Sequence, residues 1–140
     1  MAKNEDVVKN NLFGFGDLNV AFAKYFKGNS YLNGLVTPVG EIDVNVSNVN
    51  FEPCCRNNWH IHHNGYQILL VTAGEGWYQE VGQPAQLLKA GDVIAIKPGI
   101  KHWHGATKDS WFSHIAITKG TSEWIEPVSD EEYAQLGGNE

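Results

Sequence analysis

Apolar and polar residues alternate with a period of two through much of the middle of the chain. Residues 42–47 alternate strictly, which predicts a half-buried strand. Val49 and Phe51 continue the alternation after a change of phase at residues 47 and 48, and such a change predicts a β-bulge. The pattern favours strands over helices in this part of the chain.

Short apolar runs, separated by turns that contain glycine or proline, follow this strand. The runs cover residues 67–72, 77–81, 93–96 and 111–118. The first two flank a glycine-rich turn at residues 73–76, which predicts a hairpin. Many short strands with such regular turns predict an all-β sandwich or barrel.

Helical patterns occur near both ends of the chain. Residues 18–26 carry apolar side chains at i, i+3, i+4 and i+7, which predicts a helix capped by Asp17 and ended at Gly28. Ser129 and Glu132 have the spacing of a capping box, which predicts a second short helix. A chain of 140 residues has the size of one domain. We expect an N-terminal extension, a core and a helical tail over residues 1–36, about 37–119 and 120–140.

Composition and charge narrow the roles that the chain can play. It carries 10 Lys and Arg against 16 Asp and Glu, a net charge of −6, so we expect no nucleic-acid partner. No apolar run approaches the ~20 residues of a membrane helix, and the first residues lack the apolar core of a signal peptide. Cys54 and Cys55 are adjacent and form no disulfide framework. We therefore expect a cytoplasmic protein that does not bind a membrane.

The histidines give the strongest indication of function. All six lie between positions 60 and 114, outside the segments with helical patterns. His60 and His62 are two residues apart, so on a strand their side chains point to one face and can bind one metal ion. Gln67 follows five residues later, and His102 follows the turn at residues 97–99. Taken alone, the pair of histidines is equally consistent with a solvent-exposed strand face.

The spacing of these residues resembles the first motif of the cupin superfamily. That motif reads Gly, five residues, His-x-His, three or four residues, Glu, six residues, Gly. This chain has a matching frame of Cys54, His60, His62, Gln67 and Gly74. It departs from the motif twice, because Cys54 stands in the position of the first glycine and Gln67 in that of the glutamate.

The second cupin motif reads Gly, five residues, Pro-x-Gly, two residues, His. Gly91, Gly99 and His102 occupy the matching positions, whereas Lys97 stands in the proline position and Pro98 follows it. Together the motifs imply a double-stranded β-helix, or jelly-roll, barrel, here with short N- and C-terminal helices. They also imply a metal site made of His60, His62, Gln67 and His102.

Longer stretches resemble one group of small bacterial cupins. The matching stretches are residues 58–62, 67–69, 101–106 and 111–114. That group includes cupins named alongside carboxymuconolactone decarboxylases, and manganese-binding cupins with hydroxynitrile lyase activity. The resemblance implies one divalent metal ion per chain, with manganese as the first candidate. Iron, zinc, nickel and cobalt also suit mixed nitrogen and oxygen ligands with open positions.

Replacing the motif's glutamate by Gln67 changes the expected chemistry. Three imidazoles and an amide oxygen are all neutral, so none of the ion's charge is cancelled and the ion acts as a stronger Lewis acid. Such a site favours a carbonyl or anionic substrate in a lyase or decarboxylase-like reaction. We expect His114, or alternatively His104, to move a proton as the catalytic base.

Other functions remain open from the sequence. One alternative is a cupin that binds a small ligand without catalysis, another is a metal-dependent dioxygenase, and a third is a barrel that the metal only stabilises. We expect a small molecule as the partner inside the barrel. By analogy with other small cupins, we expect a homodimer.

Overall fold

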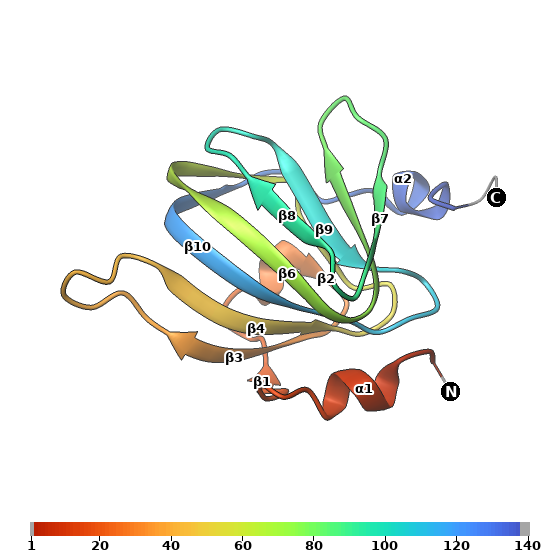
Figure 1. Ribbon diagram of the computed structural model, residues 1–140. Helices are drawn as coiled ribbons and strands as arrows, with labels where there is room; N and C mark the ends of the chain where they lie inside the picture. The colour runs from red at the N-terminus through yellow and green to blue at the C-terminus, as the bar shows by residue number, and fades with distance from the viewer. Residues whose placement is uncertain (1, 138–140) are drawn as a thin grey trace.

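The computed structural model describes residues 2–137, which form mostly strands with short helices near the two ends (Figure 1). The elements in chain order are α1 (Glu5–Lys9), β1 (Asp17–Leu18), the 3-10 helix η1 (Ala23–Tyr25), β2 (Phe26–Lys27), β3 (Ser30–Val36), β4 (Asn45–Phe51), β5 (Arg56–Asn57), β6 (His60–Glu80), β7 (Gln86–Lys89), β8 (Val93–Ile96), β9 (His102–Ala106), β10 (Phe112–Trp124) and α2 (Asp130–Ala134).

The strands form one curled sheet with β6 at its centre. The order is β1-β3-β4-β10-β6-β9-β5-β2, and β7 and β8 also pair with β6. The pairs are antiparallel, and β6 meets β9 twice: residues 76–80 run opposite to residues 102–106, and a parallel bridge joins His60 to His102. In Figure 1 the sheet curves round an interior. The all-β jelly-roll barrel expected from the sequence is therefore confirmed.

The barrel interior changes from polar to apolar along β6. His60, His62 and Gln67 come first on the inward face, and Leu69 and Val71 follow. Strand β10 runs antiparallel and matches this order, because its inward residues pass from Thr118 opposite Gln67 to Phe112 opposite Gly74. The apolar end forms the main core, where each large side chain contributes about 1.5–3 kcal/mol by leaving water. Its buried residues are Val49, Phe51, Cys55, Leu69, Val71, Tyr78, Leu88, Ile96, Ala106, Phe112 and Ala116.

The expected hairpin over residues 67–81 is wrong. Strand β6 runs without a break from His60 to Glu80. Gly74 and Gly76 lie inside it at points where other chain segments come very close. A Cβ at Gly74 would overlap the carbonyl oxygen of Trp111, and one at Gly76 would meet Gly105 and the ring of Phe112. These glycines permit close packing of strands and do not mark a turn.

The expected helix over residues 18–26 is also wrong. This segment contains β1, the turn η1 and β2, and its backbone bonds partly to other strands. The amide N–H of Asn19 donates to Ser30 O at 2.8 Å, and Asn58 N–H donates to Tyr25 O at 2.8 Å. Tertiary pairing therefore overrides the helical spacing of the apolar residues. The one α-helix of the N-terminal segment is α1, which the sequence pattern did not predict.

The expected bulge at residues 47 and 48 is absent from the pairing of β4 with β10, which is regular from Asn45 to Phe51. The register shift lies on β3 instead, between Gly34 and Val36. The phase of the pattern changes because the N-terminal segment covers the outer face of β4. Asn48 and Asn50 are buried there. Their side-chain Nδ2 atoms donate to the backbone carbonyls of Gly14 (2.6 Å) and Phe15 (2.8 Å).

The C-terminal helix is confirmed, including its capping box. Ser129 Oγ accepts from the backbone N–H of Glu132 at 3.0 Å, and the Glu132 carboxylate accepts from the backbone N–H of Ser129 at 3.2 Å. Strand β10 runs on to Trp124, so α2 takes up only Asp130–Ala134 of the tail. Residues 138–140 of that tail lie outside the described residues.

Both cysteines are free thiols, Cys54 exposed and Cys55 buried. The φ angle of Cys54 is 71°, in the left-handed region that favours glycine, which explains why the cupin motif has glycine here. Among residues 2–137, no helix combines the length and apolar character needed to span a membrane.

Candidate metal centre

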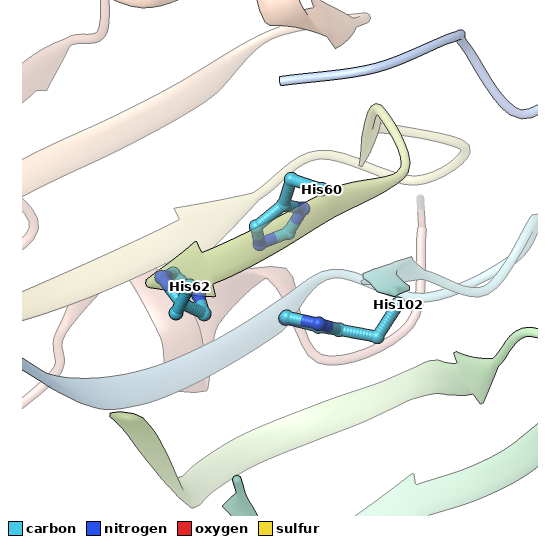
Figure 2. Close-up of side chains that lie close together, drawn as sticks. All are labelled: His60, His62 and His102. Atoms are coloured by element: carbon cyan, nitrogen blue, oxygen red, sulfur yellow. The ribbon is translucent and has the colours of Figure 1, made fainter. Parts of the chain in front are cut away.

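Three histidines from two paired strands converge at the polar end of the barrel (Figure 2). His60 and His62 project from the same face of β6, and His102 begins β9 directly opposite His60. One ring nitrogen of each lies within 4.8 Å of those of the other two, and all three side chains are buried. The structure therefore brings together the three histidines that the sequence motifs single out, in a group that can hold a metal ion.

Backbone carbonyls orient two of the three rings. The Nδ1–H of His60 donates to Asn58 O at 2.8 Å, and that of His102 donates to Ile100 O at 2.9 Å. In neutral imidazoles this leaves the lone pair on Nε2. The Nε2 atom of His102 is buried and has no hydrogen-bond partner among the described residues. A buried acceptor without a partner is unfavourable by about 1–3 kcal/mol, so this atom fits a site that binds an ion.

Gln67 lies beside the third histidine. Its Oε1 is 3.1 Å from His62 Nε2, and its Nε2 donates to Thr118 Oγ1 at 3.0 Å. Two ligands at about 2.1 Å from one ion, at right angles, would be about 3 Å apart. The spacing of His62 Nε2 and Gln67 Oε1 fits that geometry. Ser122 Oγ contacts the other nitrogen of His62 at 3.1 Å.

Burial keeps these imidazoles neutral. It holds the pKa of His60 well below its usual value, lowers the pKa of His62, and lowers the pKa of His102 to about 4. The cause is the same in each case, because burial penalises the protonated ring. A neutral ring keeps the lone pair that a metal ion needs, so the site is ready to bind metal at neutral pH.

A cavity of about 630 Å³ adjoins the cluster. The N-terminal segment closes part of it with Asn19, Phe22 and Phe26, and β10 supplies Trp124, whose ring lies 4.6 Å from that of His60. Among the lining residues that the structure describes, none is Lys or Arg. The lining residues are Asn19, Phe22, Phe26, Leu32, Pro38, Asp43, Asn45, Ser47, Val49, Asn57, His60, His62, Gln67, His104, His114, Ala116, Thr118, Gly120, Thr121, Ser122 and Trp124.

His104 and His114 line the same cavity but lie outside the cluster of three. Their ring centroids are 4.9 Å apart, with the ring planes at 75°. Both side chains are buried, and His104 Nδ1 and both ring nitrogens of His114 have no partner among the described residues. Burial holds the pKa of His104 well below its usual value and lowers that of His114 to about 3. Both rings are therefore neutral and can exchange hydrogen bonds with a ligand.

The remaining histidine lies away from the site. His63 is exposed, and its Nε2 lies 2.7 Å from Glu123 Oε1. Sequence reasoning missed Asn57, Ser122 and Trp124 as residues of the cavity. Thr118 was also missed, although it follows His114 by four residues on the same face of β10, a spacing that could have revealed it.

Comparisons with known proteins agree with this geometry. The cupin domain family model matches residues 47–118. A curated protein of Granulicella tundricola named (R)-mandelonitrile lyase is 38% identical over 115 residues, which cover 79% of this chain and 87% of that protein. The crystal structure of a cupin-like protein from Thermotoga maritima superposes with a TM-score of 0.83 and 42% identity, covering 90% of this chain and 96% of that one.

A second structure from Thermotoga maritima, described as a predicted oxalate decarboxylase, superposes with a TM-score of 0.66. It is 18% identical and covers 75% of this chain and 93% of that one, so it supports the fold alone. The family model, the curated relative and the geometry of the histidine cluster lead to one conclusion. This chain belongs to the cupin family.

Proposed function

We propose that this protein is a metal-dependent lyase that splits a small, neutral α-hydroxynitrile into a carbonyl compound and hydrogen cyanide. One observation carries the proposal. Two neutral imidazoles, His104 and His114, line the same cavity as the cluster of three histidines but lie apart from that cluster. A site that only bound metal for stability would not need buried polar groups without partners in an adjoining cavity.

The proposed ligands of the ion are His60, His62, Gln67 and His102. Four neutral ligands leave the remaining positions of an octahedral ion open for a substrate. The resemblance to manganese-binding cupins favours manganese as that ion. The ion would supply a Lewis acid that stabilises negative charge on a substrate oxygen. Gln67 supports this role because, unlike a glutamate, it cancels none of the ion's charge.

The walls of the cavity favour a neutral, partly aromatic substrate. Phe22, Phe26 and Trp124 provide apolar surface, and the described lining includes no Lys or Arg to pair with a carboxylate. The relative from Granulicella tundricola bears the name of a lyase for (R)-mandelonitrile, a neutral aromatic α-hydroxynitrile. We therefore take mandelonitrile as the first substrate to test.

The reaction requires the hydroxyl proton to leave and the cyanide to take up a proton. In the proposed step His114 accepts the hydroxyl proton, and the O–H electrons form the carbonyl bond. As the carbonyl bond forms, the carbon–carbon bond breaks, and its electron pair leaves with the cyanide carbon. The protonated imidazole returns the proton to the cyanide, so His114 ends the cycle neutral. His104 is the alternative residue for this role.

The test is cleavage of racemic mandelonitrile, followed by the absorbance of the benzaldehyde formed. We expect turnover by manganese-loaded protein, loss of turnover after chelation, and loss in His102→Ala. His63→Ala is the matched control, because His63 is exposed and lies outside the cluster. Binding of mandelonitrile or benzaldehyde without turnover would instead favour a cupin that binds a ligand without catalysis.

We also propose that the protein is a homodimer formed through its N-terminal third. Among the described residues, the outer edge of β3 bonds only to β1, at Tyr31 and Leu32, and to Asn19, at Ser30. Leu35, Val39 and Ile42 are exposed on β3 and the loop to β4, and Val39 retains 68% of its accessible surface. A second copy can pair with the free edge across a two-fold axis and cover these side chains.

Light scattering after gel filtration tests this proposal. It should give the mass of a dimer, and Val39→Lys should shift the protein toward monomer.

A further inference from the structure

The side chain of Asn57 makes two contacts with one residue of the cavity, His104. Asn57 lies on the short strand β5, next to β2 and β9, and is buried. Its Oδ1 accepts from the backbone N–H of His104 at 2.9 Å, and its Nδ2 lies 3.1 Å from His104 Nε2. The amide therefore spans the backbone and the ring of a single histidine.

The first contact determines what the second must be. A backbone N–H can only donate, so the atom of Asn57 that faces it is the amide oxygen. The amide nitrogen then faces the ring, and it too can only donate. His104 Nε2 must therefore be the acceptor. In a neutral imidazole whose Nε2 carries the lone pair, the proton is on Nδ1.

The Nδ1 atom of His104 is buried and has no partner among residues 2–137. The rings around His104 include those of His60, Phe51 and His114, whose centroids lie 5.9 Å, 5.8 Å and 4.9 Å from the centroid of the His104 ring. No hydrogen bond joins Nδ1 to any of them. Leaving a buried N–H without an acceptor is unfavourable, so this atom is suited to an acceptor on a ligand that enters the cavity.

We propose that Asn57 is a positioning residue that fixes His104 as the Nδ1–H tautomer, so that His104 presents a hydrogen-bond donor to the ligand. The ligand atom that it meets carries a lone pair, such as a carbonyl oxygen or a nitrile nitrogen. The catalytic part of this inference rests on the proposed function, whereas the tautomer itself does not. The assignment also separates two roles, because His104 has no free acceptor and His114 remains as the base.

The direct test is ¹⁵N NMR of the histidine rings in metal-free protein and in protein loaded with diamagnetic Zn²⁺. His104→Gln identifies the signals of His104. We expect the wild type to carry the proton on Nδ1. In Asn57→Asp, the second carboxylate oxygen can accept from the ring, so the proton should move to Nε2. A proton on Nε2 of His104 in the wild type would overturn the inference, whatever the enzyme's activity.

The kinetic test uses mandelonitrile cleavage by the manganese-loaded protein. We expect Asn57→Asp to lower kcat by about 100-fold, a typical contribution of one positioned hydrogen-bond donor, with a much smaller change in KM. Asn29→Asp is the control of equal charge, because Asn29 is exposed and does not line the cavity. Asn57→Leu covers the case in which the Asn57→Asp protein does not fold. This variant should leave a mixture of tautomers at His104 and also lower kcat.

A moved proton with unchanged kcat would refute the catalytic role of Asn57 while keeping the tautomer assignment. If the wild type shows the expected tautomer but no turnover, the proposed function fails and the tautomer assignment stands.

Discussion

The amide oxygen of Gln67 lies 3.1 Å from Nε2 of His62, and Thr118 holds the other end of the amide. This pair places an uncharged oxygen where the cupin motif has a carboxylate. The substitution affects the charge of the site more than its shape, because glutamine and glutamate have nearly the same size. The charge can therefore be tested with little disturbance of the packing.

We predict that Gln67→Glu keeps the metal and weakens the binding of anions to it. The added negative charge lies next to the ion and opposes a second anion there. Azide binding to the metal-loaded protein, followed by calorimetry, should weaken by about tenfold or more, equivalent to about 1.4 kcal/mol. Gln83→Glu adds the same charge on an exposed turn and should leave azide binding unchanged. Equal azide affinity in wild type and Gln67→Glu would mean that residue 67 does not contact the ion.

His102→Ala should abolish metal binding and remove the stabilisation that the metal provides. A ligand present at 100 times its dissociation constant stabilises the folded state by about 2.7 kcal/mol. Elemental analysis should find about one ion per wild-type chain and none in the variant. Added metal should raise the Tm of the wild type but not that of His102→Ala. A variant that kept its full metal content would exclude His102 as a ligand.

His114→Gln should keep the metal and lose most of the turnover. Glutamine fills much of the space of the imidazole but cannot accept and return a proton. We expect kcat to fall by about 100-fold or more, the usual contribution of a general base. Metal content and the circular dichroism spectrum should match those of the wild type, which would separate loss of chemistry from loss of structure. Unchanged turnover would show that His114 is not the base.

The buried His114 also makes stability depend on pH. Burial lowers its pKa from 6.5 to about 3, so between these values the unfolded chain binds a proton that the folded chain does not. Stability is therefore complete above pH 6.5 and falls as the pH drops toward 3. One such histidine accounts for about 2 kcal/mol between pH 7 and pH 5.

Urea unfolding of the metal-free proteins tests this. Between pH 7 and pH 5, His114→Gln should lose less free energy of unfolding than the wild type does, by that amount. An identical loss in wild type and variant would show that His114 is not buried as a neutral ring.

Local sequence patterns predicted that His60, His62 and His102 come together. His60 and His62 lie on one strand, so their common direction follows from the period of two, and the motif spacing brings in His102. The structure joins them because β9 pairs with β6 opposite His60. Such features depend on local geometry and on one pairing that the family resemblance already implied.

The missed features depend on contacts between distant segments. Phe22 and Phe26 have helical spacing, but their segment bonds to other strands and these rings line the cavity. Asn57 acts on a residue 47 positions away, and nothing in its local sequence indicates that. The stretch around Gly74 has the sequence of a turn, yet the glycine is needed because another chain segment passes against it.

A matched pair of glycines tests that last point. Gly74 and Gly82 have almost the same φ, 78° and 79°, so the backbone strain of adding a side chain is equal at both. A Cβ at Gly82 meets open space, whereas one at Gly74 overlaps the backbone of Trp111. Gly74→Ala should therefore lower the free energy of unfolding more than Gly82→Ala does. We expect a difference of about 1–3 kcal/mol, the usual penalty for overpacking. Urea unfolding of both variants measures it, and equal losses would mean that Gly74 is needed only for its backbone angle and that β6 and β10 can move apart at this point.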